Sequence, residues 1–519
     1  MRYDFLRPTG GKPLTTFPSY DENQPAQAAF HPEWAATRRK AVRGLGWQAL
    51  NTLLRQLATF LTGIVLARLL SPEEFGLVGI AVMFSFWIGI LGDAGVGAAL
   101  IQREMLAPEL VNAGFWVASG VGLLSGAVLV VVSPAVSHFY GYPGLIPIMA
   151  VYAVSLWLGG LNAIPGALLR RQLDFRRVSM VEVAGTVTSG GVAILLASQG
   201  FASMSIPIGS AAGLLMALTL YGVLRLFPPV RWPTLSAVRQ LGRFPIFASG
   251  ARAAEVLRVT IDNAFVGKFL GATPLGFYGF GFNLISIPEY RLVGLVTQVA
   301  FPTLANIRAD LTRVRELYLR LLRLATLVVL PLLVGLRLVA DRLVPLVYGS
   351  RWEPAVPLIQ VLCFAGVCSA LAVLTDSPML ALGHAAWTWR ANVLWVIALG
   401  VGLYVVLITR QGLIGVAWAV SIVALLVCLL RNFVTMRLCL ATPRMLLGAI
   451  LPSIVAALAM TASVAVLQRL CAWVEAGWGT VLGIIGAGGL IYTFIALLLL
   501  PELRHVGQRL LVGKAAAAK

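Results

Sequence analysis

Charged residues are scarce in this chain, and most of those present carry one sign. Only 12% of the 519 residues are charged, and Lys plus Arg outnumber Asp plus Glu by 40 to 21. Hydrophobic residues make up 59% of the chain, and the mean hydropathy is +0.87. Soluble domains are roughly 45–50% apolar. This composition excludes a water-soluble enzyme and indicates an integral membrane protein.

Histidine and cysteine are rare as well, which removes several kinds of site. The four histidines are scattered over the predicted tail and loops, so the sequence predicts no metal cluster. The five cysteines lie within or beside apolar runs, where a thiol packs as a small hydrophobic group. No catalytic residue, metal or organic cofactor is therefore expected. The net charge of +19 is assigned to arginines that orient a membrane protein, and nucleic-acid binding is not expected.

Long apolar runs are what the chain has instead. They are continuous rather than alternating, so they predict membrane-spanning helices and not barrel strands. The expected fold is an all-α polytopic membrane protein with about 14 transmembrane helices. The predicted spans are 45–70, 74–100, 111–136, 144–168, 178–198, 204–226, 244–270, 277–304, 321–348, 356–382, 391–409, 412–436, 446–468 and 479–500.

Arginines in the connecting loops predict the orientation of these spans. If the N-terminus is inside, the arginine-rich loops 170–177, 225–243 and 308–323 all fall on the cytoplasmic side. The even number of spans returns the C-terminus to that side. We therefore expect a bacterial inner-membrane protein with both termini in the cytoplasm. Residues 1–40 are predicted to be a disordered tail, and residues 501–519 a second tail.

An internal repeat divides the spans. The segment ARLLSPEEFGLVG (67–79) aligns without gaps with GKFLGATPLGFYG (267–279), which places Gly76 opposite Gly276 at an offset of 200 residues. Six spans in each half preserve orientation, so a pseudo-twofold axis along the membrane normal is predicted. The predicted parts are an N-lobe at 41–226, a C-lobe at 244–437, and two added helices at 446–500.

Several charged residues lie inside predicted spans. Each costs roughly 2.5–3.5 kcal/mol at the bilayer centre on insertion scales, so such residues are candidates for function. In the seventh span, Arg252, Glu255, Arg258 and Asp262 share one helix face. Through the 200-residue offset Arg55 corresponds to Glu255, and the two are predicted to pair. The alternative is that these charges are salt bridges that hold helices together.

Four segments carry a resemblance to a known family: LARLLSPEEFGLVGIA (66–81), GDAGVGAALIQRE (92–104), ALLRRQLDFRR (167–177) and IDNAFVGKFLGATPLGFYGFGFN (261–283). With the spans and the repeat, they make the chain similar to the Wzx-type flippases of the multidrug/oligosaccharidyl-lipid/polysaccharide exporter superfamily. It looks most like the branch that includes the colanic acid exporter. The resemblance implies alternating-access transport of undecaprenyl-diphosphate-linked repeat units for exopolysaccharide, capsule or O-antigen synthesis.

The resemblance also implies a cationic cavity. The arginines that would line it and bind diphosphate are Arg55, Arg252, Arg258 and Arg291. The candidates for gating, or for binding a coupling Na⁺ or proton, are Glu255, Asp262, Asp93 and Glu289. Expected partners are the bilayer, the lipid-linked glycan, and a polymerase and chain-length regulator of the same pathway. A multidrug/cation antiporter of this superfamily and a membrane-embedded polysaccharide polymerase or ligase remain alternatives.

Overall fold

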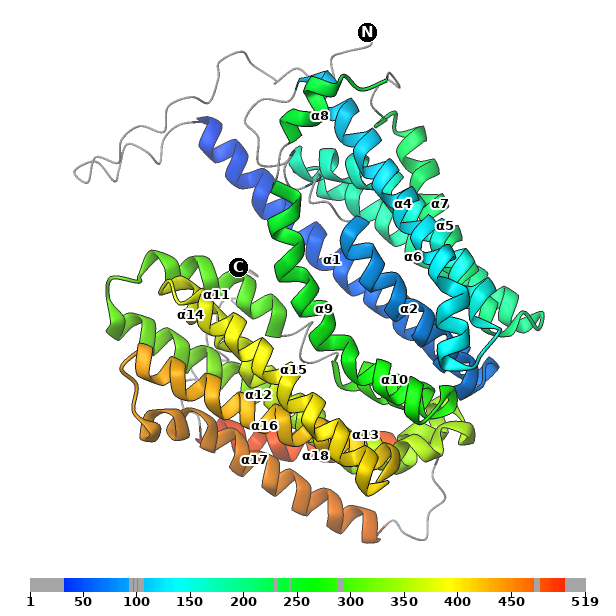
Figure 1. Ribbon diagram of the computed structural model, residues 1–519. Coiled ribbons are helices and arrows are strands. Elements are labelled where there is room, and N and C mark those ends of the chain that lie inside the picture. The colour runs from blue at the N-terminus through cyan, green and yellow to red at the C-terminus, as the bar shows by residue number, and fades with distance from the viewer. Residues whose placement is uncertain are drawn as a thin grey trace, which may run out of the picture. The chain divides into compact units, whose positions relative to one another are not determined.

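The structure is a computed structural model that describes residues 32–92, 97, 100, 107–227, 232–241, 244–286, 293–470 and 477–499. Within these ranges the regular elements are helices and no strand occurs (Figure 1). Twelve of the described helical segments, from Gly46–Leu69 to Trp478–Leu499, are long and apolar enough to cross a membrane. The predicted all-α polytopic membrane fold is confirmed.

The predicted count of about 14 spans is compatible with these twelve segments. The two other predicted spans fall on 244–270 and 277–304. Helix α9 (Phe244–Phe269) has 26 residues, which is about 39 Å at 1.5 Å per residue and long enough to span a bilayer. Because of its charged residues, α9 is not one of the twelve apolar segments. The other span corresponds to two shorter helices, α10 (Ala272–Ser286) and α11 (Gly294–Asn306).

The chain divides into two compact units, and unit 1 comprises residues 1–70 and 80–256. Its glycines let helices approach closely, because a side chain at Gly160 would overlap the Ala118 carbonyl, and one at Gly209 the Ser189 carbonyl. Helices α4, α5, α6 and α7 lie side by side (Figure 1). The elements are α1 (Pro32–Leu69), most of α2 (Pro72–Gly92), α4 (Pro108–Tyr140), α5 (Leu145–Arg171), α6 (Phe175–Ser198), η3 (Ala202–Met204), α7 (Ser205–Val223), α8 (Leu235–Leu241) and the first half of α9.

Unit 2 comprises residues 71–79 and 257–519. The last two helices pack against α12, where Val339 shares a buried cluster with Ala456 and Tyr492. The predicted lobe boundaries stay a prediction, although residues 71–79, placed in the first half by the repeat, pack in unit 2. Besides the start of α2, the second half of α9, α10 and α11, the helices are α12 (Leu311–Tyr348), η5 (Ser350–Ala355), α13 (Val356–Leu374), α14 (Asp376–Ala381), α15 (Ala385–Thr409), α16 (Gly412–Leu438), α17 (Pro443–Leu470) and α18 (Trp478–Leu499).

Residues Pro72, Gly76, Ala272 and Gly276 form a close contact between the first turns of α2 and α10, which we call the α2–α10 seam. A side chain at Gly76 would overlap the backbone carbonyl of Ala272, and a side chain at Gly276 would overlap that of Pro72. The two contacts exchange under the 200-residue offset. This reciprocity is what a twofold-related repeat requires.

An aromatic cluster packs beside the seam. The Phe75 ring meets the fully buried Trp352 ring edge-on at 5.2 Å between centroids. Phe280 of α10 lies 4.3 Å from the same indole. Ser71 begins α2 with a capping box, because its hydroxyl accepts from the Glu74 amide at 3.3 Å and its own amide donates to the Glu74 carboxylate at 2.6 Å. The capping box thus stabilises the first turn of α2, and packing against Trp352 and α10 holds that turn in unit 2.

The outer surface is strongly apolar. Large aliphatic and aromatic side chains such as Val131, Leu458, Leu490 and Phe494 are exposed. Apolar patches of this extent are unstable in water but are the normal lipid-facing surface of a membrane protein. The chain is a multi-pass membrane protein.

Candidate functional site

Five polar side chains in unit 1 form what we call the Glu182 cluster, and they come from three helices. Oε2 of Glu182 accepts from Nδ2 of Asn51 at 2.8 Å and from Nη1 of Arg55 at 2.7 Å. Its other oxygen, Oε1, accepts from Nη2 of Arg170 at 2.8 Å. Nε of Arg55 donates to Oγ1 of Thr186 at 3.2 Å. One carboxylate thus joins α1, α5 and α6.

Helical spacing places these residues together. Asn51 and Arg55 lie one turn apart on α1, and Glu182 and Thr186 lie one turn apart on α6, so two pairs meet where the helices pack. Arg170 lies in the last turn of α5, just before the short connection to α6. Asp174 caps α6, because its side chain accepts from the amide of Arg177. The tight α5–α6 connection therefore keeps Arg170 beside Glu182.

The cluster is cationic on its exposed side. The side chain of Glu182 is 17% exposed, whereas those of Arg55 and Arg170 are 47% and 59% exposed. Two guanidinium groups against one carboxylate leave a net charge of +1. Arginine has five N–H donors in a planar fork, so both side chains keep donors beyond those that bind Glu182. This arrangement is suited to a phosphate-type anion.

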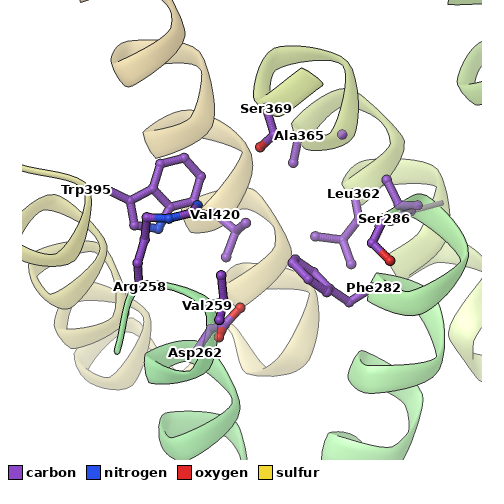
Figure 2. A pocket seen from close by; sticks show the side chains of 12 residues that line it. Arg258, Val259, Asp262, Phe282, Ser286, Leu362, Ala365, Ser369, Trp395 and Val420 are labelled. Carbon is purple, nitrogen blue, oxygen red and sulfur yellow. The ribbon is translucent and has the colours of Figure 1, made fainter. Parts of the chain in front are cut away.

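A second polar site, the Asp262 pocket, lies in unit 2 (Figure 2). Asp262 of α9 is only 4% exposed, and its Oδ2 accepts from the buried Tyr278 hydroxyl at 2.5 Å. One turn earlier on α9, the Arg258 guanidinium lies over the Trp395 ring, 5.7 Å from its centroid. Leu257, on another face of the helix, is 41% exposed. Around Asp262, the charged side chains of α9 are therefore directed at protein.

Most of the remaining pocket lining is apolar or weakly polar. Figure 2 shows that Phe282 and Ser286 of α10, Leu362 and Ser369 of α13, and Val420 of α16 line the pocket. A guanidinium and a carboxylate at the edge of such a pocket suit a small polar group rather than a whole glycan. The Asp262 pocket is thus a candidate for ion binding or for helix positioning.

A third charged site holds α13, α14 and α16 together. Arg431 of α16 is buried, and its Nε donates to Oγ1 of Thr375 at 3.0 Å. Its Nη2 forms an ion pair with Oδ1 of Asp376, the first residue of α14. Asp376 is partly exposed. This pair marks the point where the predicted span 356–382 breaks into two helices.

The structure brings some of the predicted site residues together. Arg258 and Asp262 line one pocket, and Arg55 lies in the Glu182 cluster, bound to Glu182. Arg252 and Glu255 belong to α9, but their side chains are outside the described set, so the predicted pairing of Arg55 with Glu255 stays a prediction. The candidates that lie outside the described residues are Asp93, Glu289 and Arg291.

Sequence reasoning missed Glu182, Arg170 and Arg431 as members of polar clusters. Glu182 lies inside the predicted span 178–198 and Arg431 inside 412–436, so an intramembrane charge was visible in both cases. Arg170 was assigned to a loop, whereas α5 extends through Arg171. A search for every acid within a span, followed by the basic residues at neighbouring helix ends, would have found the Glu182 cluster.

Characterised relatives match most of the chain. The teichuronic acid biosynthesis protein TuaB of Bacillus subtilis is 28% identical over 394 residues, covering 74% of this chain and 80% of the relative. The lipopolysaccharide biosynthesis protein WzxC of Escherichia coli is 23% identical over 406 residues, covering 77% and 82%. The succinoglycan biosynthesis transport protein ExoT of Rhizobium meliloti is 28% identical over 331 residues, covering 63% and 66%.

Solved structures share the fold at low sequence identity. The lipid II flippase MurJ in an inward closed conformation matches with a TM-score of 0.71 and 15% identity, covering 88% of this chain and 99% of that one. An inward-facing multidrug resistance MATE family transporter of the MOP superfamily matches with a TM-score of 0.60 and 14% identity, covering 74% and 94%. Residues 65–357, more than half of the chain, match the family described as polysaccharide biosynthesis protein. The chain belongs to this polysaccharide biosynthesis protein family.

Proposed function

We propose that this protein is a flippase that moves undecaprenyl-diphosphate-linked oligosaccharide repeat units across the bacterial cytoplasmic membrane. The units would supply exopolysaccharide, capsule or O-antigen synthesis. The observation that carries this proposal is the family match over residues 65–357, joined to relatives named for polysaccharide biosynthesis and transport. The fold shared with a lipid II flippase supports it.

The Glu182 cluster supplies chemistry for the substrate headgroup. A diphosphate diester carries two negative charges, and arginine forks match its oxygens. Arg55 and Arg170 of unit 1 would bind the diphosphate. Arg252, Arg258 and Arg291 stay candidates on the sequence evidence. The polyprenyl tail would stay in lipid, because each buried methylene is worth about 0.8 kcal/mol. Only the polar headgroup and glycan then need a path through the protein.

The activity is transport, so no covalent chemistry is assigned to any residue. Alternating access would expose the headgroup site first to the cytoplasm and then to the opposite side. Asp262, Glu255, Glu289 and Asp93 are proposed to gate this change or to bind a coupling Na⁺ or proton. A polymerase and a chain-length regulator are the proposed partners that use the translocated unit.

The proposed orientation places both termini in the cytoplasm of a bacterial inner-membrane protein. Reporter fusions test it. Fusions after Gly141 and Gly349 should report an extracytoplasmic location, and a fusion after Gln172 a cytoplasmic one. Reversed signals at these three sites would rule the orientation out.

Reconstitution tests the transport activity directly. Proteoliposomes would carry an undecaprenyl-diphosphate oligosaccharide in both leaflets, and an impermeant glycosidase added outside would digest the accessible glycan. Empty liposomes should stop at about half digestion, because one leaflet is shielded. Liposomes with the protein should approach complete digestion, and those with Arg55→Gln should stay near the empty control. Digestion that stops at the same level with and without the protein would refute the proposal.

A further inference from the structure

Glu182 occupies both arginines of the cluster at once. Its two oxygens accept from Asn51, Arg55 and Arg170 at 2.7–2.8 Å, and its own side chain is the most shielded of the three charged groups. Any anion that binds the two guanidinium groups through the same nitrogens has to replace this carboxylate. The protein therefore carries its own competitor at the place where an anion would bind.

The partners of Glu182 make replacement feasible. Arg55 and Arg170 are about half exposed, so both can rotate toward an incoming anion. A charged carboxylate left without partners in a shielded site would be strongly unfavourable. Asn51 is itself buried and keeps one hydrogen bond to Oε2 of Glu182 when the arginines leave. Thr186 likewise provides a hydrogen bond to Arg55, because its Oγ1 accepts from Nε of Arg55.

Charge favours a diphosphate over the carboxylate at these arginines. Glu182 offers one negative charge and two oxygens, whereas a diphosphate diester offers two charges and more acceptor oxygens. We infer that Glu182 is an internal competitor of the substrate diphosphate: it binds Arg55 and Arg170 in the empty protein, yields them to the diphosphate, and reclaims them on release. This inference rests on the proposed function and extends it to a residue that never has to touch substrate.

Such competition limits affinity and promotes release. A ligand shifts an equilibrium only by its difference in contacts between two states. Here the ion pairs with Glu182 are lost on binding and regained on release, so they weaken binding by a fixed factor. Without the competitor, the headgroup would bind tightly and leave slowly. Glu182 is thus a positioning and tuning residue for turnover.

Binding measurements on the purified full chain in nanodiscs test the inference, with undecaprenyl diphosphate as the probe. Glu182→Gln keeps the shape but removes the negative charge, so the hydrogen bonds from the arginines lose their ionised acceptor, a difference of about 1 kcal/mol each. Loss of one such difference at each arginine predicts binding at least about tenfold tighter than wild type. Glu109→Gln removes an exposed acid in the same unit and should leave affinity unchanged. Uncharged undecaprenol should show no effect of Glu182→Gln.

A second comparison separates competition from a structural role. If Glu182 acts through the two arginines, Glu182→Gln should have no effect on affinity once both Arg55→Gln and Arg170→Gln are present. Transport by Glu182→Gln should also become slower while headgroup binding becomes tighter. Unchanged or weaker binding by Glu182→Gln, with normal binding by wild type, would overturn this inference alone. Failure of the wild-type protein to bind undecaprenyl diphosphate would overturn the proposed function as well.

Discussion

The α2–α10 seam gives a sharp prediction about packing. Gly76→Ala places a methyl group where the backbone carbonyl of Ala272 lies, and Gly276→Ala does the same at the carbonyl of Pro72. A backbone carbonyl in a helix cannot rotate aside, so the first turns of α2 and α10 must move apart. Both variants should therefore be destabilised.

The chain supplies matched controls one turn away. A side chain at Gly79 would lie 3.8 Å from a Leu275 methyl group, which is ordinary contact, and nothing lies within 4 Å at Gly279. Alanine raises helix propensity by about 1 kcal/mol at every interior glycine, so this gain cancels between variant and control. Overpacking costs about 1–3 kcal/mol. The seam variants should be less stable than their controls by that amount.

The stability difference between seam variants and controls is measured by thermal unfolding in detergent, with the loss of folded monomer as the readout. We expect Gly76→Ala and Gly276→Ala to unfold at lower temperature than Gly79→Ala and Gly279→Ala. The double seam variant should lose less than the two single losses combined, because one displacement relieves both overlaps. Equal unfolding temperatures for seam variants and controls would refute the reciprocal contact.

Two ion sites in unit 2 give further predictions. Asp376→Asn should destabilise the protein by about 3 kcal/mol, because the buried Arg431 loses its anionic partner, whereas position 376 itself is partly exposed to water. Unchanged thermal stability would contradict this expectation and show that another group compensates the charge of Arg431. Tyr278→Phe should cost about 1.5–3 kcal/mol by removing a donor from buried Asp262. Tyr404→Phe on the exposed surface should be neutral in the same unfolding assay, and equal losses for the two tyrosine variants would contradict the Asp262 contact.

Most of the fold could be predicted from hydropathy. Apolar runs of membrane length identify spans well, because a helix in lipid must satisfy its own backbone hydrogen bonds. The exceptions have physical causes. Helix α9 carries charged residues, of which Arg258 and Asp262 contact α15 and α10, and the predicted span 277–304 covers two separate described helices. The break near Asp376 reflects a polar contact with Arg431. Hydropathy that is averaged over a window of residues cannot detect such a contact.

The candidate sites were less predictable, because ion pairing depends on which helices are neighbours. The 200-residue offset identifies equivalent positions, and the reciprocal seam agrees with it. The offset does not predict that α1 packs against α6. That packing is what gives Arg55 the partner Glu182. Long-range neighbours come from tertiary packing of small residues, such as Gly190 against Thr62.

The central claim is that the protein moves a lipid-linked glycan from the inner to the outer leaflet. Its most direct test is the sidedness of the repeat unit in cells that lack the protein. Spheroplasts from these cells would be treated with a membrane-impermeant glycosidase, and the surviving lipid-linked units would be quantified. We expect the units to accumulate in a protected form and to become accessible when the protein is restored. Accumulated units that are already digested from outside would contradict it and would indicate that a later polymerisation step has been lost.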